Sequence, residues 1–314
     1  MSARVIMITG AAGFVGRHTV AAARARGHKV VALVRRSESV RTDWNGDTGI
    51  TPVVCDLATD QPALDGVETV IHTAASLTGD DATQKRETLA ATGNLLAAIK
   101  AQNRPVDLVL ASSISVYDTM ALAPFARLDE TTPIEPNPEQ RDAYCRAKLA
   151  QEQLCQQAEL AHLSILRIGA VFGPGQLWNS HLGVAAGPVL LRIGAKGEVP
   201  LCHVTHCAKA LVLAAETPVA LVNVLDDDRP ERARFVAALR QSGWPKWVIP
   251  VPWRLWALLA KTASLLPIRL PGLLRLPVLH ARLKPLRYSN AALHEQLGWT
   301  PEISFNAALQ EARP

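Results

Sequence analysis

Tyr144 and Lys148 are the residues whose types and spacing most directly suggest chemistry. They are four positions apart in a helical pattern at 144–161, so their side chains lie on one face about one turn apart. Bringing a phenol pKa from about 10 to about 7 requires about 4 kcal/mol. An ammonium at about 5 Å supplies about 3 kcal/mol at an effective dielectric constant of about 20. The ammonium can therefore supply most of the required shift in the phenol pKa, although the same spacing also occurs on many surface helices.

A glycine-rich loop near the N-terminus predicts a dinucleotide site. The strand-like run Val5–Thr9 leads into GAAGFVG at residues 10–16 and then into a helical stretch. Glycines allow a tight turn and a close approach of the backbone to a pyrophosphate. The start of the helix offers free N–H groups and partial positive charge to the same phosphates. We expect the cofactor to be bound by Gly10, Gly13, Phe14, Val15 and Gly16.

The end of the second strand-like run favours one of two cofactors. NAD sites usually carry an acidic residue there, which binds the ribose 2′-hydroxyl. Here the run ends in Arg35 and Arg36, with no carboxylate. Two guanidiniums can hold a 2′-phosphate by forked, charge-assisted hydrogen bonds, although they can also be a solvated strand end. The sequence therefore predicts NADP(H) over NAD(H).

Strand-like and helical segments alternate through the first 225 residues. Runs at 5–9, 30–34, 51–55, 69–72, 108–112 and 163–167 predict strands buried on both faces, and stretches at 19–26, 83–102 and 144–161 predict helices. This alternation is typical of a parallel sheet with helices on both sides. The predicted fold class is α/β, a Rossmann-type doubly wound parallel sheet with a smaller, mostly helical C-terminal substrate lobe.

The pattern changes after about residue 172. Glycine- and proline-rich loops lead to a helix at 206–216 and a strand at 221–225, and from 229 onward helices and prolines mix without strand alternation. We predict an NADP-binding Rossmann domain from residues 1–170 plus 203–226. Residues 171–202 plus 227–314 would form the substrate-binding lobe.

The order of these motifs resembles the extended short-chain dehydrogenase/reductase family, of the NAD(P)-dependent epimerase/dehydratase type, over nearly the whole chain. The glycine loop matches, and YCRAK at 144–148 is similar to the family's YxxxK pair. ASSISVY at 111–117 resembles its catalytic-serine segment. CDL at 55–57, HTAA at 72–75 and LRIGAVFGPG at 166–175 resemble segments that surround the cofactor.

The resemblance implies roles for these residues. Tyr144 would exchange a proton with the substrate oxygen during hydride transfer, Lys148 would also bind the nicotinamide ribose, and Ser113 would hydrogen-bond the reacting oxygen. Further cofactor-binding residues implied are Asp56, Leu57, His72, Ala74, Ala75, Tyr144, Lys148, Ile168 and Val171. A histidine at a strand end is also a typical packing residue, so a packing role for His72 stays open.

Three positions depart from the family pattern. Thr88 stands where the family often has asparagine, Ile168 where it has proline, and His206 where it has aspartate. These departures concern the proton relay and leave the fold prediction intact. A non-catalytic NADP-binding regulator is therefore one alternative, although the intact Ser113, Tyr144 and Lys148 argue against it.

Composition narrows the function classes. The five cysteines are scattered along the chain, and no two of them form a CxxC motif. This pattern argues against disulfides and a zinc site, and it favours a cytoplasmic protein. His203 and His206, with Cys202 and Cys207, offer no convincing metal site, so we expect no metal. Residues 232–294 hold eleven Lys or Arg and no Asp or Glu. No nucleic-acid motif accompanies this basic stretch, so we expect no nucleic-acid partner.

The substrate is the least constrained property. Nucleotide-sugar enzymes of the family typically carry an arginine before the segment at 203–205, where this chain has only Lys196. The apolar stretch with spaced cations at 251–287 is similar to the lobe of a family branch acting on sterol-like and other hydrophobic alcohols and ketones. It could cover an apolar pocket, contact a membrane surface peripherally, or simply be core and interface.

We therefore expect an NADP(H)-dependent oxidoreductase that interconverts an alcohol and a ketone or aldehyde on a hydrophobic or small carbonyl substrate. The alternative is a nucleotide-sugar epimerase or dehydratase with tightly bound NAD(P). Analogy to the family also implies a homodimer.

Overall fold

A computed structural model describes residues 3–265, 270 and 272–311 of the chain. Its centre is a seven-stranded sheet in which all neighbouring strands are parallel. The strands are β1 (Val5–Thr9), β2 (Lys29–Val34), β3 (Ile50–Val54), β4 (Thr69–His72), β5 (Asp107–Ser113), β7 (Leu163–Ile168) and β12 (Leu221–Val224). Their order is β12-β7-β5-β4-β1-β2-β3. The chain winds outward from β1 in both directions, which confirms the predicted doubly wound Rossmann-type sheet.

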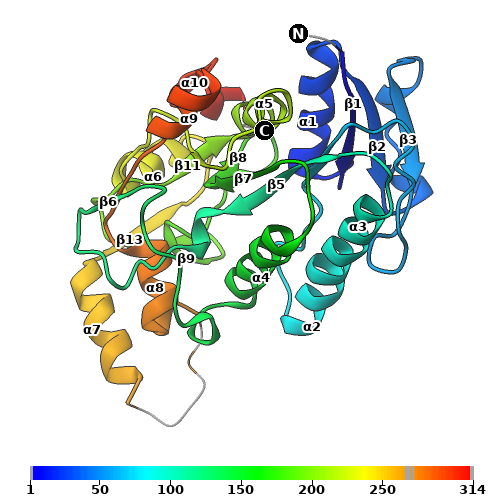
Figure 1. The fold of residues 1–314 in the computed structure, drawn as a ribbon. Helices are drawn as coiled ribbons and strands as arrows, with labels where there is room; N and C mark the ends of the chain where they lie inside the picture. The colour runs from blue at the N-terminus through cyan, green and yellow to red at the C-terminus, as the bar shows by residue number, and fades with distance from the viewer. Residues whose placement is uncertain (1–2, 266–269, 271, 312–314) are drawn as a thin grey trace.

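Helices cover both faces of this sheet (Figure 1). α1 (Phe14–Ala25) and α5 (Val204–Glu216) pack together on one face, while α3 (Ala91–Lys100) and α4 (Ala143–Gln157) lie on the other. Within β1, Ile8 belongs to the cluster with α1 and α5, whereas its neighbour Met7 belongs to the cluster with α3. Both faces are covered, so successive strand residues are apolar, as parallel sheets require.

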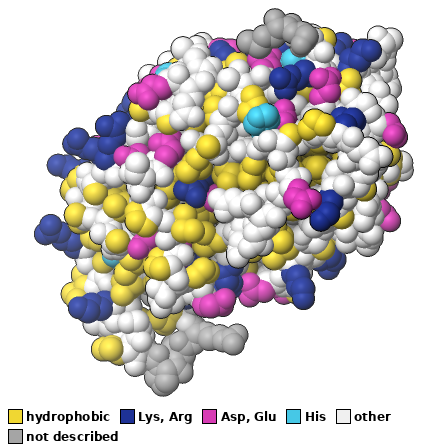
Figure 2. All heavy atoms as spheres, in the orientation of Figure 1, with side chains coloured by type: hydrophobic (Ala, Val, Ile, Leu, Met, Phe, Trp, Pro, Cys, Tyr) yellow, Lys and Arg dark blue, Asp and Glu magenta, His cyan; other side chains and the backbone are white. Residues whose placement is uncertain are grey.

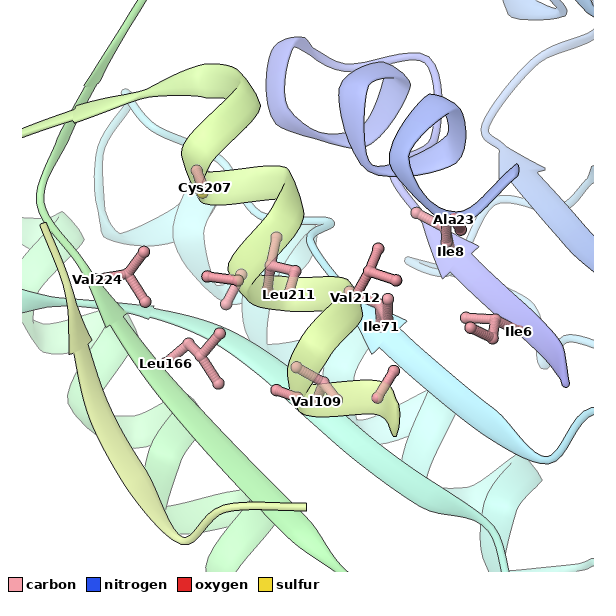
Figure 3. Close-up of a cluster of buried hydrophobic side chains, with 14 of the residues drawn as sticks. Ile6, Ile8, Ala23, Ile71, Val109, Leu166, Cys207, Leu211, Val212 and Val224 are labelled. Atoms are coloured by element: carbon pink, nitrogen blue, oxygen red, sulfur yellow. The ribbon is translucent and has the colours of Figure 1, made fainter. Parts of the chain in front are cut away.

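Figure 3 shows the core between α5 and the sheet. Leu211 and Val212 of α5 pack with Ile71, Val109 and Leu166 of the neighbouring strands β4, β5 and β7. All five side chains are fully or almost fully buried. Each stabilises the fold by about 1.5–3 kcal/mol relative to an exposed position. This packing fixes the positions of the strands, and the candidate site lies at their carboxyl ends.

The strand β3 differs from the prediction of burial on both faces. It is the last strand of the sheet, and Thr51, Pro52 and Val54 are exposed. The β-branched run at 51–55 has the composition of a buried strand, but its position at the edge was decided by the order of the strands. Pro52, which cannot donate a ladder hydrogen bond, suits an edge strand.

The C-terminal lobe contains strands that the sequence prediction missed. A three-stranded sheet joins β9 (Gly183–Ala186), β10 (Val189–Ile193) and β13 (Trp247–Val251) in the order β13-β10-β9. Two small parallel pairs join β8 (Ala170–Phe172) to β11 (Leu201–His203), and β6 (Arg127–Leu128) to β14 (Arg287–Tyr288). The prediction of no strands beyond residue 229 was therefore wrong, because β13 and β14 are short and find their partners far away in the chain.

The C-terminal lobe also contains helices, as the sequence predicts. They are α6 (Arg232–Arg240), α7 (Trp253–Ala263), α8 (Leu276–Leu283), α9 (Ala291–Leu297) and α10 (Phe305–Glu311). The stretch predicted as one helix at 83–102 instead consists of α2 (Asp81–Gln84), a π-helical segment (Lys85–Ala90) and α3. Short 3-10 helices lie at Ser37–Ser39, Thr42–Trp44, Ile114–Val116, Pro138–Gln140 and Gly272–Leu274. The division into two parts at residues 170, 203 and 227 stays our proposal.

Candidate active site

The glycine loop lies between β1 and α1, as its motif predicts. Gly10 has φ +63°, and a Cβ there would meet the backbone of Ala74 at 3.0 Å. A Cβ on Gly13 would lie 3.1 Å from the Gly10 carbonyl oxygen, and one on Gly16 would clash with the same group. Gly10 and Gly16 therefore require glycine, and Gly13 leaves little room for a side chain. Gly13 caps α1 with no side-chain hydrogen bond, and the first turn carries no acidic residue. This uncapped helix start fits a pyrophosphate.

The loop is one wall of a cavity of about 630 Å³. Of the predicted cofactor-binding residues, those that line this cavity are Gly10, Gly13, Phe14, Val15, Gly16, Ala75, Tyr144, Lys148, Ile168 and Val171. Ser113 lines it as well. The predicted catalytic residues and the glycine loop thus share one continuous cavity at the carboxyl edge of the sheet, where open α/β sheets bind ligands.

The remaining predicted cofactor-binding residues do not line this cavity. Arg35 and Asp56 follow adjacent strands, with Arg35 Nε 3.9 Å from Asp56 Oδ1 and Arg35 Nη2 3.6 Å from Glu87 Oε2. Arg36 is exposed beside them. Leu57 is buried, and its carbonyl accepts a hydrogen bond from Asn94. These positions lie at the ends of β2 and β3, to one side of the glycine loop.

Lys148 is held by α4 with its ammonium buried beneath the cavity. The helix begins at Asp142, whose carboxylate accepts a hydrogen bond from the Cys145 N–H at 2.9 Å. Lys148 Nζ donates to the carbonyl of Ala111 at 2.8 Å and to Oε1 of Gln151 at 2.9 Å. The same ammonium lies 6.0 Å from the centroid of the Tyr144 ring. The predicted Tyr–Lys proximity is present.

Burial changes the proton affinities of both groups. Desolvation raises the pKa of Tyr144 to about 12, and the hydrogen-bonding interaction with Ser113 opposes the rise. Desolvation lowers the pKa of Lys148 to about 8, against the attraction of the Glu152 carboxylate. The direction for Tyr144 is opposite to the lowered phenol pKa expected from the sequence. The phenol hydroxyl is therefore protonated at neutral pH.

A buried ion pair fixes α4 against the sheet. Arg167 Nη2 of β7 lies 2.8 Å from Glu152 Oε2, and both side chains are almost fully buried. Glu152 also accepts a hydrogen bond from the Ser112 hydroxyl of β5. Removing one partner of such a pair leaves an uncompensated buried charge, which costs about 3–5 kcal/mol. The pair thus fixes the position of the helix bearing Tyr144 relative to the strand bearing Ser113.

Behind Lys148 runs a chain of buried hydrogen bonds that the sequence analysis missed. Gln151 Nε2 donates to Thr92 Oγ1 at 2.8 Å, and Thr92 Oγ1 donates to the carbonyl of Thr88 at 2.7 Å. His72 Nε2 lies 3.0 Å from Thr92 Oγ1, and His72 Nδ1 lies 2.8 Å from Thr9 Oγ1. The position of Gln151 three residues after Lys148, on the same helix face, was the available signal.

This chain of hydrogen bonds gives His72 a supporting role. Burial lowers the pKa of His72 to about 3, with Lys148 adding to the effect, so the ring is neutral. Thr9 Oγ1 accepts a hydrogen bond from the N–H of Ala74 at 3.2 Å. His72 therefore links the strand before the glycine loop, through Thr92 and Gln151, to Lys148 of α4. These contacts favour a packing role for His72.

Two departures from the family pattern are explained by their contacts. Thr88 is fully buried in the π-helical segment, where its hydroxyl accepts from the N–H of Ser76 at 3.1 Å and donates to Gln84 at 2.9 Å. His206 Nδ1 lies 2.9 Å from Asp226 Oδ1, while its Nε2 accepts from the backbone N–H of Glu302 at 3.0 Å. Thr88 and His206 thus have structural partners.

A metal site of this kind would need at least three His, Cys, Asp or Glu side chains close together. Among the residues that the structure describes, no such group is present. The five cysteines are free, and four of them are buried.

The outer part of the cavity reaches the C-terminal lobe. Its apolar lining includes Leu77, Ile114, Leu128, Trp178 and Ala281. Leu77 and Trp178 are also exposed at the surface, so two of these apolar side chains lie at the rim of the cavity.

Both arginines that line the cavity are paired with carboxylates. Arg141 Nη1 lies 3.0 Å from Glu135, and Arg282 Nη2 lies 2.8 Å from Asp142.

Comparison with known proteins agrees with this geometry. Residues 6–224, which include the whole central sheet and the Tyr–Lys pair, match the model of the NAD dependent epimerase/dehydratase family. The chain belongs to this family. Its members, within the extended short-chain dehydrogenase/reductase superfamily, are NAD(P)-dependent enzymes of the oxidoreductase type, as this chain is.

Two curated relatives are reductases. The chain is 32% identical over 248 residues to a 3-diazoavenalumate denitrifying reductase from Streptomyces, covering 73% of this chain and 77% of that protein. It is 30% identical over 250 residues to a ceramide reductase from Caulobacter vibrioides, covering 75% of this chain and 68% of that protein. The family of this chain therefore includes reductases of different small molecules.

Solved structures confirm the fold. MoeE5, in complex with UDP-glucose and NAD, is similar with a TM-score of 0.69 and 22% identity, over 98% of this chain and 96% of that one. A UDP-glucose 4-epimerase from Thermus thermophilus is similar with a TM-score of 0.67 and 22% identity, over 98% of this chain and 97% of that one. At this identity the likeness concerns the fold alone.

Proposed function

We propose that this protein is an NADP(H)-dependent reductase that converts the carbonyl group of a hydrophobic small molecule into an alcohol. The observation that carries the proposal is the single cavity that the glycine loop, Ser113 and Tyr144 line together with apolar side chains such as Leu77, Ile114 and Trp178. A dinucleotide held by the loop would supply a hydride. The remaining steps belong to residues of this chain.

Tyr144 would supply the proton. A ketone becomes an alcohol only if its oxygen gains a proton, so the site needs an acid at neutral pH. The raised pKa of Tyr144, about 12, keeps its hydroxyl protonated. Ser113 would donate a hydrogen bond to the same oxygen and so orient the carbonyl toward Tyr144.

Lys148 would hold the ribose of the cofactor and stabilise the phenolate left after proton transfer. Its ammonium is already fixed by two acceptors, Ala111 and Gln151, and loses little conformational freedom when a ligand binds. The Lys148 ammonium lies 6.0 Å from the centroid of the Tyr144 ring, so its positive charge would lower the energy of a phenolate formed there.

The proposed preference for NADP(H) rests on Arg35 and Arg36. Arg35 is about half exposed, with its guanidinium 3.9 Å from the Asp56 carboxylate and 3.6 Å from the Glu87 carboxylate. The end of β2 itself carries no carboxylate to bind a ribose 2′-hydroxyl. A 2′-phosphate would find two cations there.

The lining of the cavity favours a hydrophobic substrate over a nucleotide sugar. A diphosphate needs cations, but Arg141 and Arg282, which line the cavity, already neutralise Glu135 and Asp142. Lys196 lines a different surface groove. The ceramide reductase relative supports the same interpretation, since it is named for an apolar substrate.

Cofactor consumption tests the proposal. We expect purified protein to oxidise added NADPH faster than NADH when supplied with a panel of aromatic and long-chain ketones. A nucleotide-sugar epimerase would purify with bound cofactor and convert UDP-sugars without added cofactor. Cofactor binding with no turnover across the panel would instead favour the non-catalytic regulator. The homodimer stays a prediction that light scattering would test.

A further inference from the structure

Helix α7 (Trp253–Ala263) exposes large apolar side chains to solvent. Leu255, Leu258 and Leu259 are 52%, 58% and 49% exposed, and Leu265 just beyond the helix is 83% exposed. Because 3.6 residues make one turn, positions 255, 258 and 259 form one continuous stripe. An exposed stripe of leucines is unfavourable in water unless something covers it.

The opposite face of the same helix is also apolar. Trp253, Trp256, Ala257 and Ala260 pack into a cluster with residues of α8 such as Leu279. A helix that is apolar on both faces is typical of one that is buried on both sides. In Figure 1, α7 lies at the outer end of the lobe, away from the central sheet. The outer stripe is therefore not needed to hold the fold together.

Cations flank the stripe. Arg254 and Lys261, seven residues apart, lie on the same side of α7, and neither forms an ion pair within the described part of the chain. The wider segment at 232–294 contains no Asp or Glu. In Figure 2, hydrophobic and Lys or Arg side chains share the lower left of the molecule, where Figure 1 places α7. The surface around the helix is thus both apolar and positive.

A groove at the start of α7 adds to this positive surface. Its lining includes Arg192, Lys196, Trp253 and Arg254, together with several prolines. Arg192 Nε and Trp253 Nε1 are buried with no hydrogen-bond partner among the described residues. Donors of this kind need an acceptor, and the phosphate oxygens of a lipid headgroup are acceptors of suitable charge.

We propose that α7 docks flat on a bilayer surface that contains anionic lipids. The leucine stripe would enter the boundary between headgroups and acyl chains, while Arg254 and Lys261 would contact lipid phosphates. A second copy of the same face would bring like charges together, so self-association is disfavoured. No helix among the described residues is long and apolar enough to cross a membrane, so the contact is peripheral.

Docking would present the catalytic cavity to the bilayer. α7 packs on α8, and Ala281 and Arg282 of α8 line that cavity. Its rim also exposes Leu77 and Trp178. This part of the inference rests on the proposed reductase function: an apolar carbonyl compound dissolved in the membrane would reach Tyr144 without crossing bulk water.

Co-sedimentation of the full chain with vesicles tests the docking independently of catalysis. We expect binding to vesicles of phosphatidylcholine mixed with phosphatidylglycerol, weaker binding to pure phosphatidylcholine, and loss of binding at high salt. The triple variant Leu255→Ser, Leu258→Ser, Leu259→Ser should lower the partition coefficient at least about tenfold. The double variant Arg254→Gln, Lys261→Gln should lower it about tenfold on anionic vesicles only.

Matched controls use residues outside this surface. Ile134→Ser removes another exposed apolar side chain, and Lys29→Gln removes another exposed cation; both should bind vesicles as the wild type does. All variants should keep wild-type NADPH-dependent reduction of a water-soluble ketone, which separates this proposal from the proposed function. Absence of vesicle binding by the wild type would overturn the proposal. So would a stable oligomer that the triple serine variant dissolves, since the stripe would then be a protein interface.

Discussion

The ammonium of Lys148 is hydrogen-bonded to Oε1 of Gln151 at 2.9 Å. Gln151 in turn donates to Thr92, which contacts His72. The lysine predicted to act with Tyr144 is therefore held from behind by a buried amide, and this amide is anchored to the neighbouring helix. Two predictions concern this arrangement.

The first concerns the pH dependence of reduction. The buried Lys148 has a pKa of about 8, below its usual value of 10.5, because desolvation disfavours the ammonium. The protonated form is therefore present below about pH 8 and is lost as the pH rises through that value. We expect kcat for carbonyl reduction to be constant near neutral pH and to fall above about pH 8. A rate that stays constant to about pH 10 would contradict the role of the ammonium.

The second concerns Gln151 as a positioning residue. Gln151→Leu removes an acceptor from the ammonium, so kcat should fall about tenfold and the alkaline limb should move to lower pH. Gln151→Glu keeps an acceptor and adds a negative charge, so the limb should move to higher pH. Gln153→Leu on the exposed side of α4 is the control. A purely structural role would not shift the two limbs in opposite directions.

Tyr144→Phe should abolish most of the activity. The substitution removes the proton donor while keeping the ring that lines the cavity, so kcat should fall about 10²–10⁴-fold. NADPH affinity, measured by fluorescence, should change less than about twofold, because the glycine loop is untouched. The matched control is Tyr117→Phe, whose hydroxyl donates to Asn223 away from the cavity. It should lower stability by about 1 kcal/mol and leave turnover intact.

Arg35 and Arg36 should decide the cofactor preference. We expect Arg35→Gln, Arg36→Gln to weaken NADPH binding about 10- to 100-fold and to change NADH binding little, since only NADPH carries the 2′-phosphate. Titration of both reduced cofactors measures the effect. Arg41→Gln is the control, because Arg41 is paired with Asp43 at 2.8 Å. Wild-type protein that binds NADH more tightly would refute the preference.

Acid should destabilise the fold through its buried histidines. Burial lowers the pKa of His72 to about 3 from 6.5, so below about pH 6.5 the unfolded chain takes up a proton that the folded chain does not. Stability from this residue is complete above about pH 6.5 and is lost as the pH falls toward 3. Between about pH 7 and pH 4.5 the loss is about 2 kcal/mol. Urea unfolding should show a smaller pH dependence for His72→Gln, and an unchanged one for the exposed His162→Gln.

The sequence alone determined the parallel sheet and the glycine loop. Consecutive apolar runs separated by amphipathic helices have few packing solutions, because strands covered on both faces need apolar residues throughout. Gly10 and Gly16 are determined by local geometry, since Gly10 has φ +63° and a Cβ on Gly16 would clash with the Gly10 carbonyl. The Tyr–Lys pair was found from helical spacing, which is also a local property.

Only the tertiary structure decided which residues surround these motifs. The partners of Lys148 and His72 come from separate strands and helices, so no spacing in the chain predicts the Gln151–Thr92 link. The exposure of β3 and the pairing of β13 with β10 depend on the spatial order of the strands within their sheets. The raised pKa of Tyr144 follows from burial, which a pairwise Coulomb calculation from sequence omits. The leucine stripe of α7 has the composition of a core helix, and its exposure depends on the absence of described residues packed against it.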